Sequence, residues 1–337
     1  MLSEPEYPSF FGFPFFTLYT GIHRLSVAVG VIPREMTGAN RSASHAGSWY
    51  SDNTRELDRQ LTEWLSSPQR VGVARAIIAP HAGYSYCGET AAYAFKQIVP
   101  DNIHRIFILG PSHVAALDRC ALTTCKKYKT PLGDLNVDTQ VVNDLFAEFG
   151  ADFEKMDRRD EESEHSLEMQ LPFLAKVMQS RGLDSFSIVP ILVGSLDIRW
   201  QKKYGRILAR YLEDPKNLFV ISSDFCHWGN RFRYTPQDGS DQPIFRQIER
   251  LDRQGMEAIE SLNPDVFNTY LSKTHNTICG RNPICVMLQA AEHFRLANNH
   301  THEFKFLRYS QSNQARHASD SSVSYAAGAL FIHPRAN

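Results

Sequence analysis

Three short apolar runs in this chain each lead directly into a polar motif that contains histidine. The runs are Ala76–Ala79, Ile106–Leu109 and Leu218–Ile221. Four apolar residues in a row, bounded by turn-forming residues, are typical of strands buried on both faces of a sheet. Segments with the apolar spacing of helices, Gly88–Ile98 and Arg199–Leu212, lie between these runs. The alternation predicts an α/β fold in which a central mixed sheet is flanked by helices.

The remaining apolar patterns extend this alternation along the chain. Further helices are expected at 54–65, 141–149 and 166–180, with three more between about 244 and 296. Further strands are expected at 186–193, 304–309 and 323–331, and a strand pair within 120–137 around a turn at 130–133. The sequence shows no repeat of fixed period and no obvious linker. We therefore predict one domain from 41 to 335.

Residues 1–40 differ in composition from the rest. They contain no lysine and crowd phenylalanines around Pro14. Glu4 and Glu6 precede the apolar stretch and Arg24 interrupts it, which argues against a secretory signal and against a membrane span. We predict a variable, poorly ordered extension, with a mitochondrial leader as the alternative.

Charge and cysteine content exclude several classes of protein. The chain has 36 Lys+Arg and 37 Asp+Glu, with a formal net charge of −1. Such a balance does not favour binding to nucleic acid or to an anionic membrane surface. Six cysteines in 337 residues are too few for a disulfide scaffold, and no two are spaced as Cys-x-x-Cys. Reduced thiols in a cytoplasmic protein are the expectation.

The carboxyl ends of neighbouring parallel strands meet at one edge of a sheet, where ligands collect. His81 and His113 come just after the first two apolar runs, and Cys279 stands just before a predicted helix. Two imidazoles and a thiolate suit copper, zinc or iron rather than magnesium or calcium. We predict that His81, His113 and Cys279 form a metal site. The alternative is two histidines bonded to backbone carbonyls and a cysteine packed as a small apolar residue.

Asp224 and His227 come after the third run, three residues apart. A carboxylate fixes the tautomer of an imidazole, which then acts as a general base or acid; the alternative is a helix-capping Asp. His165 lies in the acidic run 161–168, which most simply is the solvated start of a helix, with a turn toward the crevice as the alternative. The remaining histidines are expected at the surface. They include His293, His300, His302 and His317.

Aromatic residues lie in or beside these motifs. Trp49, Trp228, Tyr84 and Tyr86 either wall a pocket for an aromatic ligand or belong to the core. The sequence lacks a G-x-S-x-G elbow, a Walker A loop, a G-x-G-x-x-G fingerprint and an H-E-x-x-H helix. Esterase, nucleotidase, dehydrogenase and zinc-peptidase interpretations therefore have no motif to support them.

Five unusual strings in order, at 43–50, 80–84, 110–113, 222–229 and 276–281, resemble the Memo family, named for a mediator of receptor-driven cell motility. The resemblance covers about 41–333. It implies a fold similar to class III extradiol dioxygenases, which are non-haem iron enzymes that open catechol rings. It also implies that His81 and His113 match the two metal-binding histidines of that fold, and that Cys279 replaces a carboxylate. A thiolate favours copper or redox-active iron and counts against ring cleavage.

The resemblance further implies a cytoplasmic protein, with the nucleus as a second location, that modulates reactive oxygen species and links receptor tyrosine kinases to Rho-type GTPases and NADPH oxidase. It implies a pocket for phosphotyrosine peptides. Trp49 and Tyr86 would hold the ring beside His45, and Arg231 or Arg281 would pair with the phosphate. Asp224 and His227 match further pocket residues.

These observations leave three hypotheses. The first is a copper- or iron-binding redox protein. The second is a non-haem iron oxygenase acting on an unidentified phenolic, and the third is a metal-independent phosphotyrosine-peptide module.

Overall fold

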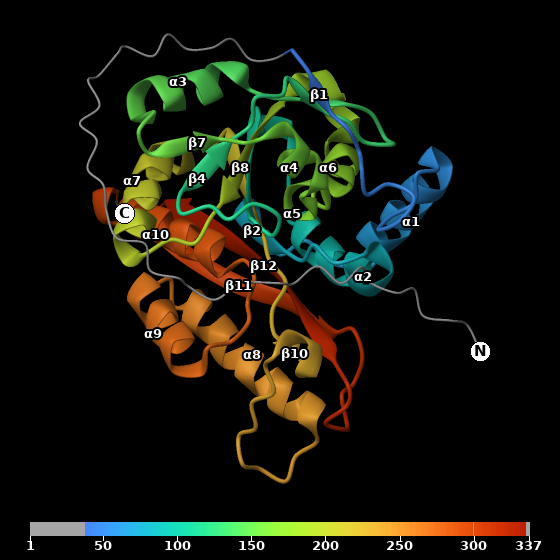
Figure 1. The fold of residues 1–337 in the computed structure, drawn as a ribbon. Coiled ribbons are helices and arrows are strands. Elements are labelled where there is room, and N and C mark those ends of the chain that lie inside the picture. Colours follow the sequence, from blue (N-terminus) through green and yellow to red (C-terminus); the bar gives the residue numbers. More distant parts are fainter. Residues whose placement is uncertain (1–37, 299, 335–337) are drawn as a thin grey trace, which may run out of the picture. The chain divides into compact units, whose positions relative to one another are not determined.

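The computed structural model describes residues 38–298 and 300–334, and a mixed sheet lies at its centre (Figure 1). Within these residues the sheet has nine strands in the order β10-β12-β2-β9-β3-β8-β4-β7, with β11 paired to β12. Their bounds are β2 Ala74–Ala79, β3 Arg105–Pro111, β4 Cys120–Leu122, β7 Phe153–Lys155, β8 Ser187–Val193, β9 Asn217–Ser222, β10 His227–Trp228, β11 His300–Gln311 and β12 Ser322–Pro334. The predicted mixed α/β fold is confirmed.

The middle of the sheet is parallel. β9 lies between β2 and β3 and runs parallel to both, and β8 continues the parallel set beyond β3. Every residue of β9 is buried, because helices cover both faces of this part of the sheet. The carboxyl ends of β2, β9 and β3 therefore lie side by side, and the three histidine motifs begin there.

Antiparallel pairs lie on both sides of this parallel middle, and the edge strand β7 pairs parallel with β4. β12 pairs antiparallel with β2, β11 and β10, and β4 pairs antiparallel with β8. The predicted strand pair within 120–137 is divided between two sheets. β5 (Lys127–Tyr128) and β6 (Leu135–Asn136) form the pair around the turn, and β1 (Asn40–Arg41) adds to β5 in a separate small sheet.

Helices flank the sheet on both sides (Figure 1). α7 (Ile198–Glu213) and α10 (Arg281–Ala297) pack together on one face, while α1 (Thr54–Ser66), α2 (Tyr84–Phe95) and α6 (Leu171–Met178) lie on the other side. The other helices are α3 Thr139–Phe149, α4 Arg158–Ser163, α5 His165–Glu168, α8 Ile244–Glu260 and α9 Pro264–Thr274. Short 3-10 helices are η1 Pro100–Asn102, η2 Gln179–Arg181, η3 Leu183–Ser185 and η4 Asn230–Phe232.

The helix expected at 166–180 is interrupted. α5 ends at Glu168 and α6 begins at Leu171, with Pro172 in its first turn. Proline lacks a backbone N–H and fits the first turn of a helix better than its interior. The chain therefore starts a new helix at this point.

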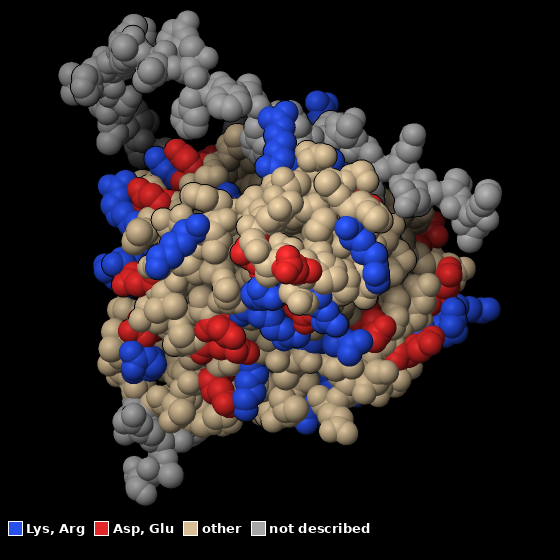
Figure 2. Space-filling model, turned by 90° about the horizontal axis from the view of Figure 1, so that it is seen from below, with Lys and Arg blue, Asp and Glu red and all other residues tan. Residues whose placement is uncertain are grey.

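The part of the chain from 38 onward that the structure describes forms one compact unit. The extension expected at 1–40 lies outside the described residues except for 38–40, of which Asn40 belongs to β1. No described helix is long and apolar enough to cross a membrane. Basic and acidic side chains are intermixed on the face seen in Figure 2, in agreement with the net charge of −1.

Close packing of α7 on α10 depends on Gly205. A Cβ at this position would lie 2.3 Å from the Cβ of Gln289 and 3.1 Å from the backbone nitrogen of Ala290. We expect Gly205→Ala to lower the free energy of unfolding by about 1–3 kcal/mol, since the helices must move apart. Urea denaturation measures this loss, with the exposed Arg206→Ala on the same helix as control. A Gly205→Ala protein as stable as wild type would contradict the tight helix crossing.

Candidate metal centre

The predicted metal ligands meet beyond the carboxyl ends of β2, β9 and β3. His81 comes after β2, His113 comes after β3, and Cys279 lies two residues before α10. The ring centroids of His81 and His113 are 5.2 Å apart, and the Cys279 sulfur is 3.2 Å from Nε2 of His81. The fold thus brings together two imidazoles and a thiol that are far apart in sequence.

The hydrogen bonds of His81 define which ring nitrogen is free. The Ser222 hydroxyl donates its own proton to the carbonyl of Ser166, at 2.6 Å. It therefore accepts from Nδ1 of His81, which lies 2.8 Å away. Nε2, the nitrogen that faces Cys279, is left with a lone pair. Burial, aided by the charge of His113, lowers the pKa of His81 and keeps the ring neutral.

His113 is oriented by Glu164. Nδ1 of His113 lies 2.9 Å from one carboxylate oxygen of Glu164, and the backbone N–H of His113 donates to the other at 2.6 Å. Burial opposes the charged form of both groups. The carboxylate nevertheless raises the pKa of His113 to about 10, and His113 in turn holds the pKa of Glu164 well below its usual range. A histidine backed by a carboxylate is the usual arrangement of a metal-ligating imidazole.

His165 also belongs to the centre, although it was not predicted as a ligand. Its ring stacks on that of His113 with centroids 4.5 Å apart and an interplanar angle of 19°. Donor atoms of His81, His113 and His165 all lie within 4.8 Å of one another. Burial and the charge of His113 lower the pKa of His165 to about 3. The turn of His165 toward the crevice, which the sequence left open as the alternative, is the one that the structure shows.

The expectation that 161–168 is a solvated helix start is wrong. Glu161, Glu164 and Glu168 are all buried. Each is paired with a residue distant in sequence, which a local charge pattern does not reveal. Glu164 bonds His113, Glu168 bonds Arg41 at 2.7 Å, and Glu161 bonds the Tyr128 hydroxyl.

Glu168, on α5, forms hydrogen bonds with several residues of segment 41–50. Besides Arg41, it accepts from the Tyr50 hydroxyl and lies beside Nδ1 of His45, each at 2.7 Å. Burial alone would raise the pKa of Glu168, but His45 and Arg41 lower it to about 2. The carboxylate is therefore ionised, and it bonds both the backbone N–H and Nδ1 of His45.

Asp224 and His227 were expected to bond each other, but each is hydrogen-bonded to backbone groups instead. Nδ1 of His227 faces the carbonyls of Phe225 at 2.9 Å and Thr277 at 3.1 Å, so it carries the proton and Nε2 is free to accept one. Burial lowers the pKa of His227 to about 4. Asp224 instead accepts the backbone N–H of His81 at 2.8 Å, and burial raises its pKa to about 7. Backbone carbonyls, not Asp224, orient His227.

Only some of the predicted aromatic residues line the centre. The Trp49 ring lies 4.5 Å from His165 and 5.5 Å from His45. Tyr86 is 40% exposed on α2, and its ring and the Trp49 carbonyl both border Gly83. Trp228 is buried in a small cluster with Ile248, and Tyr84 is buried in the main core. Core packing therefore accounts for these last two.

The two predicted phosphate-binding arginines lie near the centre at the surface. Arg231, in η4, has its guanidinium 4.5 Å above the Phe232 ring, which itself lies 5.2 Å from that of His227. Arg281 is the exposed first residue of α10, two positions after Cys279. Their role in ligand binding stays a prediction.

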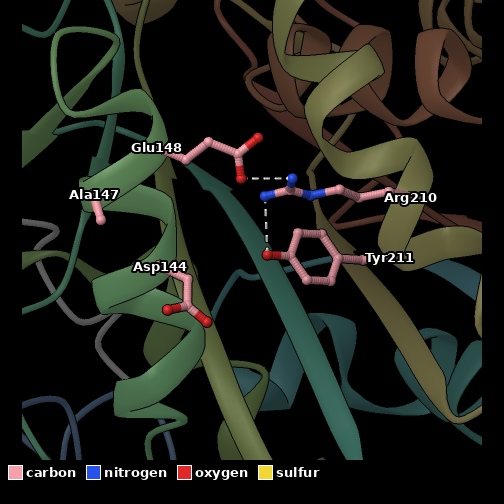
Figure 3. Close-up of a pocket in the computed structure, with 5 residues that line it drawn as sticks. All are labelled: Asp144, Ala147, Glu148, Arg210 and Tyr211. Carbon is pink, nitrogen blue, oxygen red and sulfur yellow. Dashed lines mark hydrogen bonds and ion pairs between the residues drawn. The ribbon is translucent and has the colours of Figure 1, made fainter.

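A surface pocket between α3 and α7 contains none of these residues (Figure 3). Arg210 crosses it, donating to Glu148 at 2.7 Å and to the Tyr211 hydroxyl at 3.3 Å. Glu148, Arg210 and Tyr211 thus bond one another, and we assign the pocket no part in the centre.

A family model described as Memo-like protein matches residues 41–329, most of the chain. The chain belongs to the Memo-like family. The match begins at Arg41, the partner of Glu168. Relatives in this family include "Protein memo-1 homolog" of Caenorhabditis elegans, 66% identical over 87% of this chain and 83% of the relative. "Protein MEMO1" of Homo sapiens is 52% identical over 87% of this chain and 98% of the relative.

A solved structure of an uncharacterized protein from Escherichia coli K12 aligns with this Memo-like chain at a TM-score of 0.46 and 13% identity. The alignment covers 74% of this chain and 98% of the bacterial one.

Proposed function

We propose that this Memo-like protein binds a redox-active metal ion, copper or iron, through His81, His113 and Cys279. One observation carries the proposal. The Cys279 sulfur lies 3.2 Å from Nε2 of His81, which carries no proton because Ser222 keeps the proton of the ring on Nδ1. Family membership adds support.

The donor set fits these metals. Both histidines have Nδ1 bonded to an oxygen, which directs Nε2 outward as the ligand atom. Imidazole suits copper and iron in either common oxidation state, and a thiolate is the soft donor that stabilises reduced copper. The bound ion would supply one-electron exchange. The protein's own part is to fix the imidazoles through Ser222 and Glu164 and to surround them with buried side chains.

We further propose that the centre modulates reactive oxygen species in the cytoplasm or nucleus, in signalling between receptor tyrosine kinases and Rho-type GTPases. Family membership supports this role. Trp49 and Tyr86 offer aromatic groups, and Arg231 and Arg281 offer cationic groups, for a phosphotyrosine ligand.

Elemental analysis of protein purified from its own host tests the metal proposal. We expect copper or iron in wild type and its loss in His81→Ala. His104→Ala is the matched control, since this exposed histidine precedes the opposite end of β3. Equal metal content in wild type and His81→Ala would overturn the proposal.

Glu164 is predicted to support metal binding without touching the ion. We expect Glu164→Gln to weaken metal affinity by about 10–100-fold, because the amide orients His113 less firmly and does not supply the charge. Competition with a chromophoric chelator measures the affinity. Glu148→Gln, in the surface pocket of Figure 3, is the control. Unchanged affinity in Glu164→Gln would show that the carboxylate does not support a ligand.

The orientation of His227 favours a second candidate function, oxygenation of a phenolic. Nε2 of His227 is free to accept a proton, and the neutral ring suits a general base. The test is oxygen uptake with a panel of catechols after anaerobic loading with Fe²⁺. Uptake that His227→Ala abolishes would support this candidate, and uptake equal in both proteins would contradict it.

A further inference from the structure

The helix α8 carries a fully buried carboxylate, Asp252. Its donors include the backbone N–H of Cys226 at 3.2 Å, the side-chain amide of Asn276 at 2.9 Å and the hydroxyl of Tyr309 at 2.9 Å. Burial raises the pKa of Asp252 to about 6, although hydrogen bonds from Ser324, Asn276 and Tyr309 lower it. The carboxylate is therefore ionised above about pH 7. Buried charges of this kind concentrate at functional sites.

The peptide group between Phe225 and Cys226 links Asp252 to His227. Its N–H donates to Asp252, and its carbonyl accepts from Nδ1 of His227 at 2.9 Å. These two groups point in opposite directions in a trans peptide, so the carboxylate and the imidazole bond opposite sides of one planar unit. Hydrogen bonds in a chain polarise one another, and a negative charge on the N–H side strengthens the carbonyl as an acceptor. The carboxylate thus acts on the ring through the peptide.

A second link runs through Asn276. Its amide donates to Asp252 and also to the Tyr270 hydroxyl, at 2.8 Å. The next residue, Thr277, bonds His227 with both its side chain and its backbone. The Thr277 hydroxyl accepts the backbone N–H of His227 at 2.8 Å, and the Thr277 carbonyl lies 3.1 Å from Nδ1. Asp252 therefore holds the residues that directly precede Thr277 and His227.

We propose that Asp252 is a positioning residue for His227, whose charge acts through the 225–226 peptide to hold the ring proton on Nδ1 and leave Nε2 free. This inference rests on the second candidate function, in which His227 takes a proton from a phenolic. That step moves one proton from the phenol oxygen to Nε2 and leaves a phenolate and an imidazolium. The charge of Asp252 stabilises the imidazolium without taking up the proton. Asp252 thus has the part that the sequence assigned to Asp224.

Nitrogen-15 NMR of the full chain, labelled at histidine, measures the tautomer of His227, because protonated and unprotonated ring nitrogens differ clearly in chemical shift. Zn²⁺ is present so that an ion bound at the centre is diamagnetic, and the His227 signals are those that His227→Phe lacks. We expect the Nδ1–H form to dominate in wild type. In Asp252→Asn the tautomer ratio is expected to shift at least about tenfold toward Nε2–H, because a hydrogen bond to a charged group is lost. An unchanged ratio would overturn the proposal.

Two further variants separate positioning from loss of stability. Asn276→Ala keeps the charge of Asp252 but breaks the second link, so it is expected to shift the ratio in the same direction by a smaller factor. If Asp252→Asn does not fold, an unchanged ratio in Asn276→Ala overturns the proposal. Met256→Ala is the control, since Met256 is buried in the main core on the same helix. A shift in Met256→Ala as large as that in Asp252→Asn would show general loosening and contradict a positioning role.

Oxygen uptake with catechols after loading with Fe²⁺ reports separately on the candidate function. We expect Asp252→Asn to lower kcat by about 10–100-fold with KM unchanged, because the substrate still binds but its proton acceptor is misplaced. Uptake as fast as in wild type would overturn the proposal. No uptake in wild type would overturn the candidate function, and the tautomer ratio of Asp252→Asn would still decide whether Asp252 positions His227.

Discussion

Glu168→Ala is expected to lower the free energy of unfolding by about 3–5 kcal/mol. The side chains of Glu168 and Arg41 are both 0% exposed, and removal of the carboxylate leaves the buried guanidinium without its counter-charge. The Tyr50 hydroxyl, which donates to the same carboxylate, also loses its partner. Urea denaturation measures the loss. Glu63→Ala is the control, because this glutamate pairs with Arg59 at the surface and an exposed pair contributes less than about 1 kcal/mol.

The contribution of Glu168 depends on pH in a defined direction. Its pKa is lowered from 4.5 to about 2 in the folded protein, chiefly because His45 and Arg41 outweigh the effect of burial. Its stabilisation is therefore complete above the ordinary pKa and is lost as the pH falls toward 2. We expect the stability difference between wild type and Glu168→Gln to shrink between about pH 4.5 and pH 2. A difference that stays constant over this window would show that the carboxylate is not held ionised.

His113→Phe is expected to weaken Cu⁺ binding by more than about 100-fold, a larger effect than that of its supporting carboxylate. Phenylalanine retains an aromatic ring to stack on His165 but supplies no donor atom. The variant therefore separates loss of a ligand from loss of packing. Competition with a chromophoric Cu⁺ chelator under reducing conditions measures the affinity, with His104→Phe as control.

A His113→Phe protein that binds Cu⁺ within about threefold of wild type would exclude His113 as a ligand, since a donor atom contributes more than this. Near-ultraviolet circular dichroism of the variant establishes whether the fold around the ring is intact.

The sequence was sufficient to predict the location of the centre. Runs such as Ile106–Leu109, bounded by turn-forming residues, are typical of buried strands, and parallel strands place the residues after their carboxyl ends at one edge of the sheet. That logic placed His81 and His113 together without knowledge of strand order. Cys279 needed the resemblance as well, because a cysteine before a helix has no distinctive pattern of its own.

Features that depend on distant partners were not predictable. Glu164 and Glu168 look solvated in a local charge pattern, and their burial depends on the positions of His113 and Arg41. The position of His165 in the centre was left as an alternative for the same reason. The backbone carbonyls that orient His227 could not be predicted either, because every residue has a carbonyl and the sequence does not show which one faces a side chain. Two-residue strands such as β10 lie below the length at which alternation is detectable.

X-ray absorption spectroscopy of the copper-loaded protein distinguishes the proposed ligands directly. We expect a sulfur neighbour at about 2.3 Å and nitrogen neighbours at about 2.0 Å from the metal, with the sulfur contribution absent in Cys279→Ser. A wild-type spectrum that contains only nitrogen or oxygen neighbours, identical to that of Cys279→Ser, would contradict a centre built from His81, His113 and Cys279.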